Sequence, residues 1–435
     1  MCIKELLKKC VIKIKLAVNL SLINDAKISA IQFTPTNTNY PDDYESFCGR
    51  GWQQSYINVH DSSFNSRPGN KYVVSVPVWA GPADMMLGYV SAFMWALLNN
   101  ASYFITSVES FFDLSKRSIE VSYESPFIQW NASFIDTQYF ECLLPTKDYY
   151  AHRGRTCRRG TIDIKPGVRL TYTHVMGVDQ YKILMKNFIR GGIQSQLYFV
   201  ASTRGNTFGI FDNPEYADIM RGYGLTRHTI FPCLFNFLFK MREEVCSSAC
   251  QRTVAMLKVN QRSDPSIIRI GIQIRHSIQT TCHFDCIDQL LEKYDSTADG
   301  NKREVILLLI CSNYEVQRAA KERYGSRLLL PEGEPVNVTT VHDRKPPQMA
   351  KDAWGLDRRA MREAARDMYL LSLTDIKVVS DRSGFALLGS ILRPQEEYRM
   401  IGVDKAGKIK RNCSAFADRG GDPLSKFAYQ WSGLR

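Results

Sequence analysis

Hydrophobic and polar positions alternate along residues 268–274, within the apolar stretch 267–274, where four isoleucines alternate with Arg269, Gly271 and Gln273. A spacing of two is typical of a β-strand with one buried face. A continuous apolar run at 305–311 instead predicts a parallel strand that is covered on both faces. Shorter apolar runs predict further strands at 72–78, 102–107, 168–174, 197–203, 327–331, 376–380 and 398–403.

Helical patterns separate most of these strands. The segment 84–99 is apolar almost throughout, which predicts a long buried helix. Ser312 and Glu315 have capping-box spacing and Gly325 follows three turns later, so a helix is predicted at 312–325. Other helices are predicted at 232–245, 286–294, 357–373 and 383–392.

Strands and helices alternate strictly after residue 266, which predicts a doubly wound parallel sheet with right-handed crossovers. A strand–helix–strand unit at 72–107 predicts a similar arrangement in the first half. The predicted fold class is therefore α/β with two Rossmann-like domains. We expect a stem rich in Asn, Pro, Ser and Gly at 1–70, a first domain at 71–260 and a second at 261–435.

The chain of 435 residues carries a net charge of +12, which suits an anionic partner. The densest basic run, at 152–159, is typical of an exposed loop. Basic and aromatic residues are not interleaved as nucleic-acid binding would require, so a nucleic-acid partner is not expected.

Twelve cysteines and five Asn-x-Ser/Thr sequons favour a secretory compartment in which disulfides persist. The segments "CSSAC" (246–250) and "CHFDC" (282–286) suit either zinc or disulfides, and the looser spacing favours disulfides. The lysine-rich start has no clean apolar core, and no segment reaches the roughly 18 apolar residues that span a bilayer. We therefore expect membrane contact only through an anchor missing from this sequence. The sequons are at Asn19, Asn100, Asn131, Asn337 and Asn412.

Two loops that directly follow strands are the main candidates for chemistry. Arg275 and His276 follow the strand at 267–274, while Ser383 and Gly384 open a helix after the strand at 376–380. Parallel strands bring such loops to one sheet edge, where open α/β folds bind ligands. An arginine fork and the free N–H groups of a helix start are both suited to a diphosphate.

These residues carry a resemblance to the GT-B fucosyltransferases, the group that spans α1,2-, α1,6- and protein O-fucosyltransferases. "IGIQIRHS" (270–277) is similar to their donor-site motif, and "DMYLLSLTDIKVVSDRSGFALLGSIL" (367–392) to a later one. "GPADMMLGYVSAFMWALL" (81–98) is similar to their N-terminal Gly-x-Gly-Asn-Arg stretch. The resemblance covers about 70 to 405 and implies a GT-B fold, in which two Rossmann-like domains face each other across a cleft.

The resemblance also implies roles for particular residues. Arg275 would bind the GDP phosphates, helped by backbone donors at Ser383 and Gly384, and Asp367 would border the nucleotide. Gln273 stands where the α1,6 type has histidine, and His276 where it has a second arginine. Gly81 and Asp84 would face the cleft from the first domain.

The implied activity is transfer of fucose from GDP-fucose to a glycan hydroxyl, inverting and independent of a divalent metal, in the Golgi or secretory lumen. Asp84 and Met85 replace the family's Asn-Arg pair. Asp84 is a candidate general base, and Arg275 the main catalytic candidate. The alternative is an inactive glycan- or nucleotide-binding relative. A galactose acceptor and an α1,2 linkage are expected by resemblance to the plant type.

Overall fold

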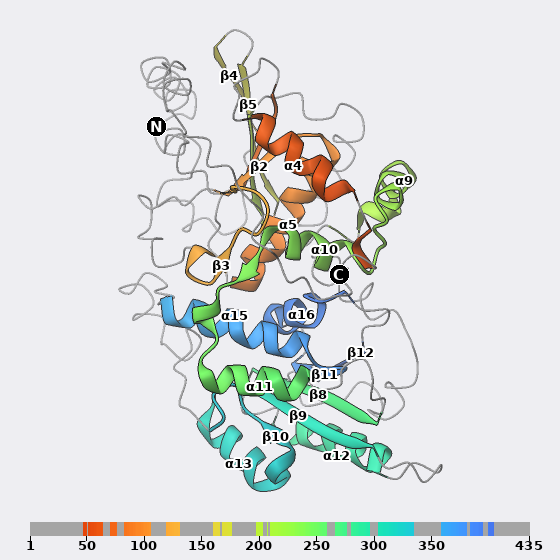
Figure 1. Cartoon of the computed structure of the whole chain (residues 1–435), viewed down its shortest axis with the longest axis vertical. Helices are drawn as coiled ribbons and strands as arrows, with labels where there is room; N and C mark the ends of the chain where they lie inside the picture. The colour runs from red at the N-terminus through yellow and green to blue at the C-terminus, as the bar shows by residue number, and fades with distance from the viewer. Residues whose placement is uncertain are drawn as a thin grey trace.

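The computed structural model shows two sheet-containing halves stacked along the long axis of the molecule (Figure 1). The residues that the structure describes are 47–49, 51–63, 70–75, 82–105, 119–130, 160–165, 168–175, 197–202, 207, 209–258, 266–275, 280–295, 303–334, 358–380, 383–394 and 399–403.

The second half contains the five-stranded sheet that the sequence predicts. Its order is β10-β9-β8-β11-β12, and every neighbouring pair is parallel. The chain builds outward from β8 in one direction and then returns to the other side of β8 with β11. This reversal is a topological switch point, where doubly wound folds leave a crevice at the carboxyl ends of the strands. The strands are β8 (Ile267–Ile274), β9 (Glu304–Cys311), β10 (Leu328–Leu329), β11 (Ile376–Ser380) and β12 (Arg399–Val403).

Helices cover both faces of this sheet. The even-numbered isoleucines of β8 pack with helices α12 and α13 in one apolar cluster. On the other face, a Cβ added to Gly271 would lie 2.6 Å from Leu371 at the end of α15. Because strand side chains alternate, Arg269, Gly271 and Gln273 all lie on the face that α15 covers. The helices are α11 (Ser248–Lys258), α12 (Thr280–Asp295), α13 (Tyr314–Tyr324), α15 (Arg358–Ser372) and α16 (Gly384–Ile391), with a 3-10 turn, η6, at Gly325–Arg327.

The start of α13 differs from the sequence-based prediction. Asn313, not Ser312, is the N-cap, and its side-chain oxygen accepts a hydrogen bond from the Val316 amide at 3.1 Å. Asparagine in an extended conformation caps at least as well as serine, which moves the helix start by one residue. The predicted end at Gly325 is confirmed, since this glycine has a φ of +56°.

The first half contains the second five-stranded sheet, in the order β2-β1-β6-β5-β4. Four of its strands are parallel neighbours, and β4 pairs antiparallel with β5 as an edge strand that the sequence pattern did not predict. The predicted α/β class is therefore confirmed, with one parallel sheet and one that is parallel except for its edge strand β4. The elements are α4 (Trp52–Ser63), β1 (Tyr72–Ser75), α5 (Pro82–Leu98), β2 (Ser102–Ile105), β4 (Gly160–Lys165), β5 (Val168–Val175) and β6 (Leu197–Ser202).

The helix predicted at 232–245 is interrupted. It ends at Leu238, because Phe239 turns extended and the next residues pair with an earlier strand. Lys240 also forms an ion pair with Glu124 at 3.0 Å. The remaining elements of this half are η2 (Ile119–Val121), β3 (Tyr123–Glu124), η3 (Gly209–Asp212), α9 (Pro214–Gly222), α10 (Ile230–Leu238), β7 (Lys240–Met241) and η4 (Glu243–Val245).

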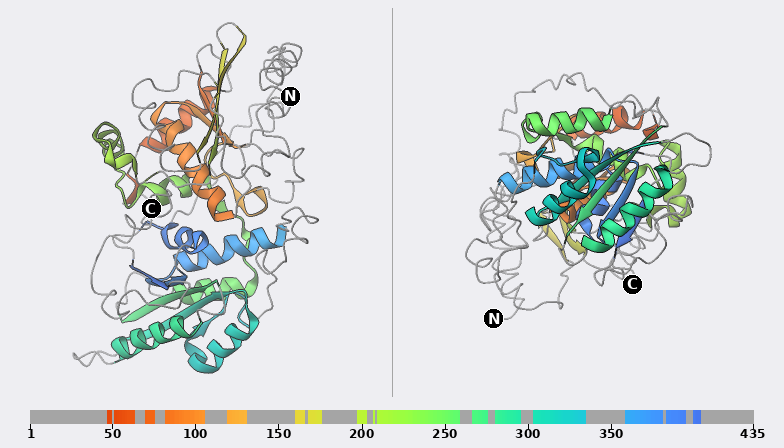
Figure 2. Two further views of the ribbon diagram at one scale, coloured as in Figure 1. Left: turned by 180° about the vertical axis from the view of Figure 1, so that it is seen from behind. Right: turned by 90° about the horizontal axis from the view of Figure 1, so that it is seen from below.

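The two halves share one apolar cluster. Helices α15 and α16 lie between the second sheet and helices α5 and α10 of the first half (Figures 1 and 2). Buried residues of all four helices belong to the same cluster, among them Phe93, Phe235, Met368 and Leu387. In addition, the Asn236 side chain of α10 donates a hydrogen bond to the carbonyl oxygen of Leu392 at 3.0 Å.

Disulfides occur in both halves. Cys48 is bonded to Cys233 across 185 residues, and Cys246 to Cys250 at the start of α11. The disulfide reading of "CSSAC" is therefore confirmed. "CHFDC" forms no bond within itself, because Cys286 is disulfide-bonded while Cys282 is a free thiol. Within the described part of the chain, no helix has the length and apolar character needed to cross a membrane.

Gly88 permits the close approach of α5 to β6. A Cβ at this position would overlap the carbonyl oxygen of Ser202 and lie 2.7 Å from its carbonyl carbon. We expect Gly88→Ala to lower the free energy of unfolding by about 3 kcal/mol, since backbone atoms must move. Gly222→Ala is the control, because nothing lies within 4 Å of its added Cβ. Urea unfolding of both variants checks this prediction, and equal stabilities would contradict it.

Lys377, the second residue of β11, is a fully buried lysine. Burial lowers its pKa to about 7, a shift that nearby Asp375 opposes and Arg393 reinforces. Its folded-state pKa is thus below the unfolded value, so the unfolded chain binds more protons between pH 7 and about 10. The free energy of unfolding should therefore rise as the pH increases from 7 to about 10. The stability gained in this way should be lost again as the pH falls back to 7.

We expect Lys377→Met to stabilise the protein by about 1–3 kcal/mol at pH 7 and to flatten this pH dependence, because no charge then loses its hydration. Urea unfolding at pH 7 and pH 9 measures both effects. Lys321→Met, at an exposed position, serves as control. A Lys377→Met protein that is less stable than wild type at pH 7 would overturn the prediction.

Candidate active site

Ser380 connects the loop of Arg275 to the loop of Ser383 at the switch point of the second sheet. Its hydroxyl accepts a hydrogen bond from the backbone N–H of Arg275 at 3.0 Å and donates one to the carbonyl oxygen of Gln273 at 3.3 Å. Its own carbonyl oxygen accepts from the N–H of Ser383 at 3.2 Å. Arg275 and Ser383 are therefore both tied to one residue, so the predicted proximity of their loops holds at the level of the backbone.

Ser383 begins helix α16 as its N-cap. The residue is extended, with φ −83° and ψ 113°, and its buried side-chain oxygen accepts from the Ala386 amide at 3.3 Å. The predicted helix start at this serine is thus confirmed. Gly384 is the first helical residue and is half-buried. The first amides of a helix lack intrahelical partners and carry partial positive charge, which favours an anion in front of them.

Arg275 and Gln273 lie in different environments although they are only two residues apart. Arg275 directly follows β8 and is exposed. The Gln273 side chain is only 6% exposed, and its Oε1 has no hydrogen-bond partner among the residues that the structure describes. Gln273 pairs in register with Val379 of β11, so its amide lies at the switch point on the face covered by α15. A buried amide oxygen without a partner is costly, which points to a ligand or water as its partner.

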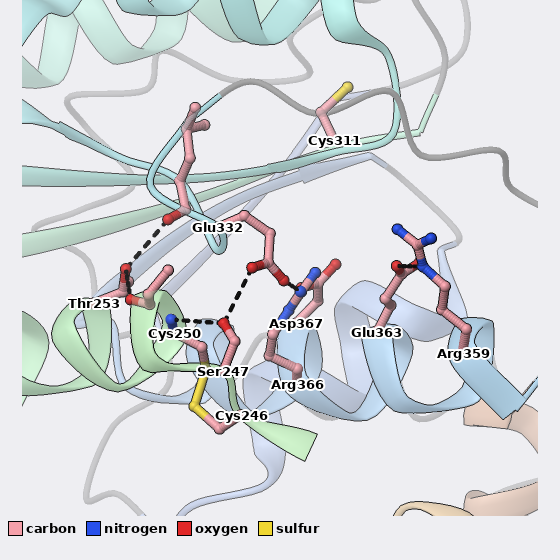
Figure 3. A network of polar contacts seen from close by, with 12 residues as sticks. Cys246, Ser247, Cys250, Thr253, Cys311, Glu332, Arg359, Glu363, Arg366 and Asp367 are labelled. Atoms are coloured by element: carbon pink, nitrogen blue, oxygen red, sulfur yellow. Dashed lines mark hydrogen bonds and ion pairs between the residues drawn. A yellow bond between two sulfur atoms is a disulfide. The ribbon is translucent and has the colours of Figure 1, made fainter. Parts of the chain in front are cut away.

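Asp367 lies at the same sheet edge but nearer to β10. It is on α15, and its Oδ1 accepts a hydrogen bond from Nε of Arg366 at 2.8 Å. Arg366 also forms an ion pair with Glu332, which follows the carboxyl end of β10 (Figure 3). Burial raises the pKa of Asp367, although the Arg366 charge and hydrogen bond lower it and Glu363 raises it. Two strand spacings of roughly 5 Å each separate β10 from β8, so Asp367 lies to the β10 side of the switch point.

The first half contributes a carboxylate from a neighbouring helix. Asp84 is in the first turn of α5, which follows β1, and it is half-buried. Helix α5 packs against α16, the helix that Ser383 caps. The structure therefore brings the helix of Asp84 to the helix of the predicted donor loop. Gly81 and His276 lie outside the described residues.

Together these groups suit a polyanionic ligand that also has neutral hydrogen-bonding groups. The backbone of a cationic residue, Arg275, is held next to a helix start at the switch point, and the half-buried carboxylate of Asp367 lies further along the same edge. Three participants escaped the sequence analysis. Ser380 belongs to the same Ser-x-x-Ser motif as Ser383 and had a signal, whereas Glu332 and Arg366 had none, because their pairing depends on the contact of α15 with the end of β10.

One groove of the second half lies away from the switch point. A groove of about 390 Å³ is lined by Arg303, Glu304 and Leu329, among others, and so lies at the amino end of β9, opposite to the switch point. In the described regions of the chain, no group of three His, Cys, Asp or Glu residues is arranged to hold a metal ion.

Comparison with known proteins found no matching family model and no matching curated protein. Among solved structures, the chain is similar to FUT1 of Arabidopsis thaliana in complex with GDP, at 17% identity and a TM-score of 0.49, over 83% of this chain and 77% of that one. It is also similar to the NodZ α-1,6-fucosyltransferase soaked with GDP-fucose, at 13% identity and a TM-score of 0.45, over 78% and 96%. A further similar structure is a family 9 glycosyl transferase of Veillonella parvula, at 10% identity and a TM-score of 0.31, over 85% and 99%.

Removing the Ser380 hydroxyl tests how the two loops are held. We expect Ser380→Ala to lower the free energy of unfolding by about 1–3 kcal/mol, because a backbone donor and a buried acceptor lose their partner. Ser62→Ala, which removes a local hydrogen bond from the Ser62 hydroxyl to the Val59 carbonyl, should cost less than about 1 kcal/mol. Thermal or urea unfolding measures both, and an equal, small loss in each would contradict the role given to Ser380.

Proposed function

We propose that this protein is a GDP-fucose-dependent glycosyltransferase that transfers fucose to a hydroxyl of a glycan. The observation that carries the proposal is the switch point, where Ser380 holds the loop of Arg275 against the cap of α16. Sequence motifs similar to those of the GT-B fucosyltransferases fall on these same loops. A doubly wound sheet binds its ligand at this place for reasons of topology alone, and the residues found there suit a diphosphate.

Arg275, Ser383 and Gly384 hold the diphosphate in this proposal. The guanidinium forms paired hydrogen bonds to phosphate oxygens, and the first amides of α16 donate to the same group. Gln273 supplies a neutral partner from the buried side, and His276 follows Arg275 in the same loop. Asp367 borders the nucleotide further along the sheet edge.

Chemistry at the fucose follows from this charge distribution. The anomeric carbon passes through an oxocarbenium-like state while the bond to the diphosphate breaks. Negative charge then grows on the diphosphate leaving group. Hydrogen-bond donors already fixed in position stabilise this charge and lower the barrier. Arg275 and the helix start perform this task without a divalent cation, so we infer a metal-independent reaction.

We infer that the acceptor attacks from the face opposite to GDP, which inverts the anomeric centre. Asp84 is the candidate general base, because it is a half-buried carboxylate on the first half's helix next to α16. A carboxylate within reach of the acceptor hydroxyl can take up its proton as the new bond forms. The proposed acceptor is a galactose residue of a glycan, in α1,2 linkage.

The disulfides Cys48–Cys233 and Cys246–Cys250 support an oxidising compartment, and we propose the Golgi or secretory lumen. The sequons support a glycoprotein there.

A second candidate function is an inactive glycan- or nucleotide-binding relative. One observation favours it: Asp84 and Met85 replace the Asn-Arg pair of the resembling family, which removes a cation from the first half. In that case the diphosphate would still bind at the switch point, but no transfer would follow.

Arg275 distinguishes the two functions. We expect Arg275→Ala to lower kcat/KM for fucose transfer from labelled GDP-fucose by about 10²–10³-fold, as loss of a transition-state donor does. Arg275→Lys should recover part of the loss, because lysine keeps the charge but not the fork. Arg318→Ala, which removes an exposed arginine of α13, is the matched control.

The measurement is the transfer of radioactive fucose from labelled GDP-fucose to a panel of glycans, with GDP-mannose as the control donor. Unfolding curves show that every variant is folded. Wild-type activity in a folded Arg275→Ala protein would refute the assignment. GDP binding without transfer to any acceptor would favour the binding function.

A further inference from the structure

Arg366 is a buried arginine whose guanidinium is shared between two carboxylates. Only 6% of its side chain is exposed, and it forms ion pairs with both Glu332 and Asp367. The contacts use different nitrogens: Nη1 faces Glu332, and Nε donates to Oδ1 of Asp367 at 2.8 Å. Because the guanidinium is planar and rigid, fixing one side of it fixes the direction of the other.

Glu332 is itself held in place from the opposite side. The Ser247 hydroxyl donates to Oε2 of Glu332 at 3.1 Å, so both carboxylate oxygens of Glu332 have partners. The Ser247 hydroxyl oxygen also accepts from the Cys250 amide at 3.2 Å. Ser247 lies between the two cysteines of the Cys246–Cys250 disulfide, which fixes the first turn of α11. A chain of contacts therefore runs from α11 through the loop after β10 to Asp367 (Figure 3).

Asp367 is the last residue in this series of contacts. One oxygen is bound by Arg366, while 20% of the Asp367 side chain remains exposed at the carboxyl edge of the sheet. The carboxylate is therefore fixed on one side and accessible on the other, as expected for a group that must meet a ligand in a defined orientation.

We propose that Glu332 and Arg366 are positioning residues that orient Asp367 toward the nucleotide. The inference rests on the proposed function, in which Asp367 borders the nucleotide. Neither Glu332 nor Arg366 needs to touch the ligand. Their task is to keep the Asp367 carboxylate ionised and in one rotamer, which spares the complex the cost of ordering it on binding.

Matched glutamates in one loop allow a direct test. Glu332→Gln removes the negative charge that pairs with Arg366. Glu334→Gln, two residues further along the chain, removes the charge of an exposed ion pair with Lys321. The affinity of the full chain for GDP is measured by calorimetry. We expect Glu332→Gln and the reference variant Asp367→Asn each to weaken GDP binding at least tenfold, and Glu334→Gln to change it less than twofold.

A second variant separates positioning from stability. Glu332→Gln alone leaves a buried guanidinium with one partner fewer, which lowers stability by itself. The double variant Glu332→Gln, Arg366→Met removes the buried positive charge and should regain melting temperature. If Arg366 merely stabilises the fold, GDP affinity returns as well; if it positions Asp367, affinity stays at least tenfold weak.

The pH dependence of GDP binding gives an independent measurement. The charged groups around Asp367 are Arg366 and Glu363 on its own helix and Glu332 beyond Arg366. Arg366 lowers the pKa of Asp367, so its removal should move the acidic limb of GDP binding to higher pH.

The outcomes are distinct. The proposal is supported if GDP binding is weak in Glu332→Gln and in the double variant, and if the acidic limb of GDP binding lies at higher pH in the double variant. Normal affinity in Glu332→Gln together with weak binding in Asp367→Asn overturns it while leaving the proposed function intact. Normal affinity in Asp367→Asn, or absence of GDP binding in the wild type, overturns both this inference and the assignment of the nucleotide to this edge.

Discussion

The hydrogen bond from the Arg275 amide to the Ser380 hydroxyl is the contact on which the proposed site depends. Parallel pairing alone brings the ends of β8 and β11 to one edge of the sheet. It does not fix the positions of the loop residues that follow the strands. Ser380 removes that freedom, because it binds the residue after β8 and also accepts from the cap of α16. The hydroxyl and the backbone carbonyl of one small residue thereby tie the backbone of Arg275 to the positive end of a helix.

The packing of α15 and α16 couples this edge to the first half. These helices cover the face of the second sheet that carries Gln273, and they share an apolar cluster with α5 and α10. The first turn of α5 carries Asp84, while the cap of α16 belongs to the predicted donor loop. Close-packed interiors transmit displacement, so a shift of α5 would be felt at the start of α16. The two halves are thus connected through well-packed helices.

Local patterns made much of the fold predictable. The strand at 376–380 and the cap at Ser383 lie where the sequence predicts them, because alternation and capping are encoded within a few residues. The break after Leu238 was not predictable, since it depends on pairing with Tyr123 and Glu124, more than a hundred residues earlier. Similarly, the pair of Glu332 and Arg366 joins two segments whose approach only the folded chain reveals. For the site, sequence could therefore place the loops at the switch point but not the contacts that orient Asp367.

The bond between Cys48 and Cys233 joins the segment before α4 to helix α10. Closing a loop of this length restricts the unfolded ensemble by an amount worth about 5 kcal/mol in the chain-entropy description. That is comparable to the whole net stability of many domains. Protein produced in a reducing cytoplasm would lack this restraint, so preparations from bacterial cytosol and from a eukaryotic secretion host would differ in yield and solubility before any residue of the active site is altered.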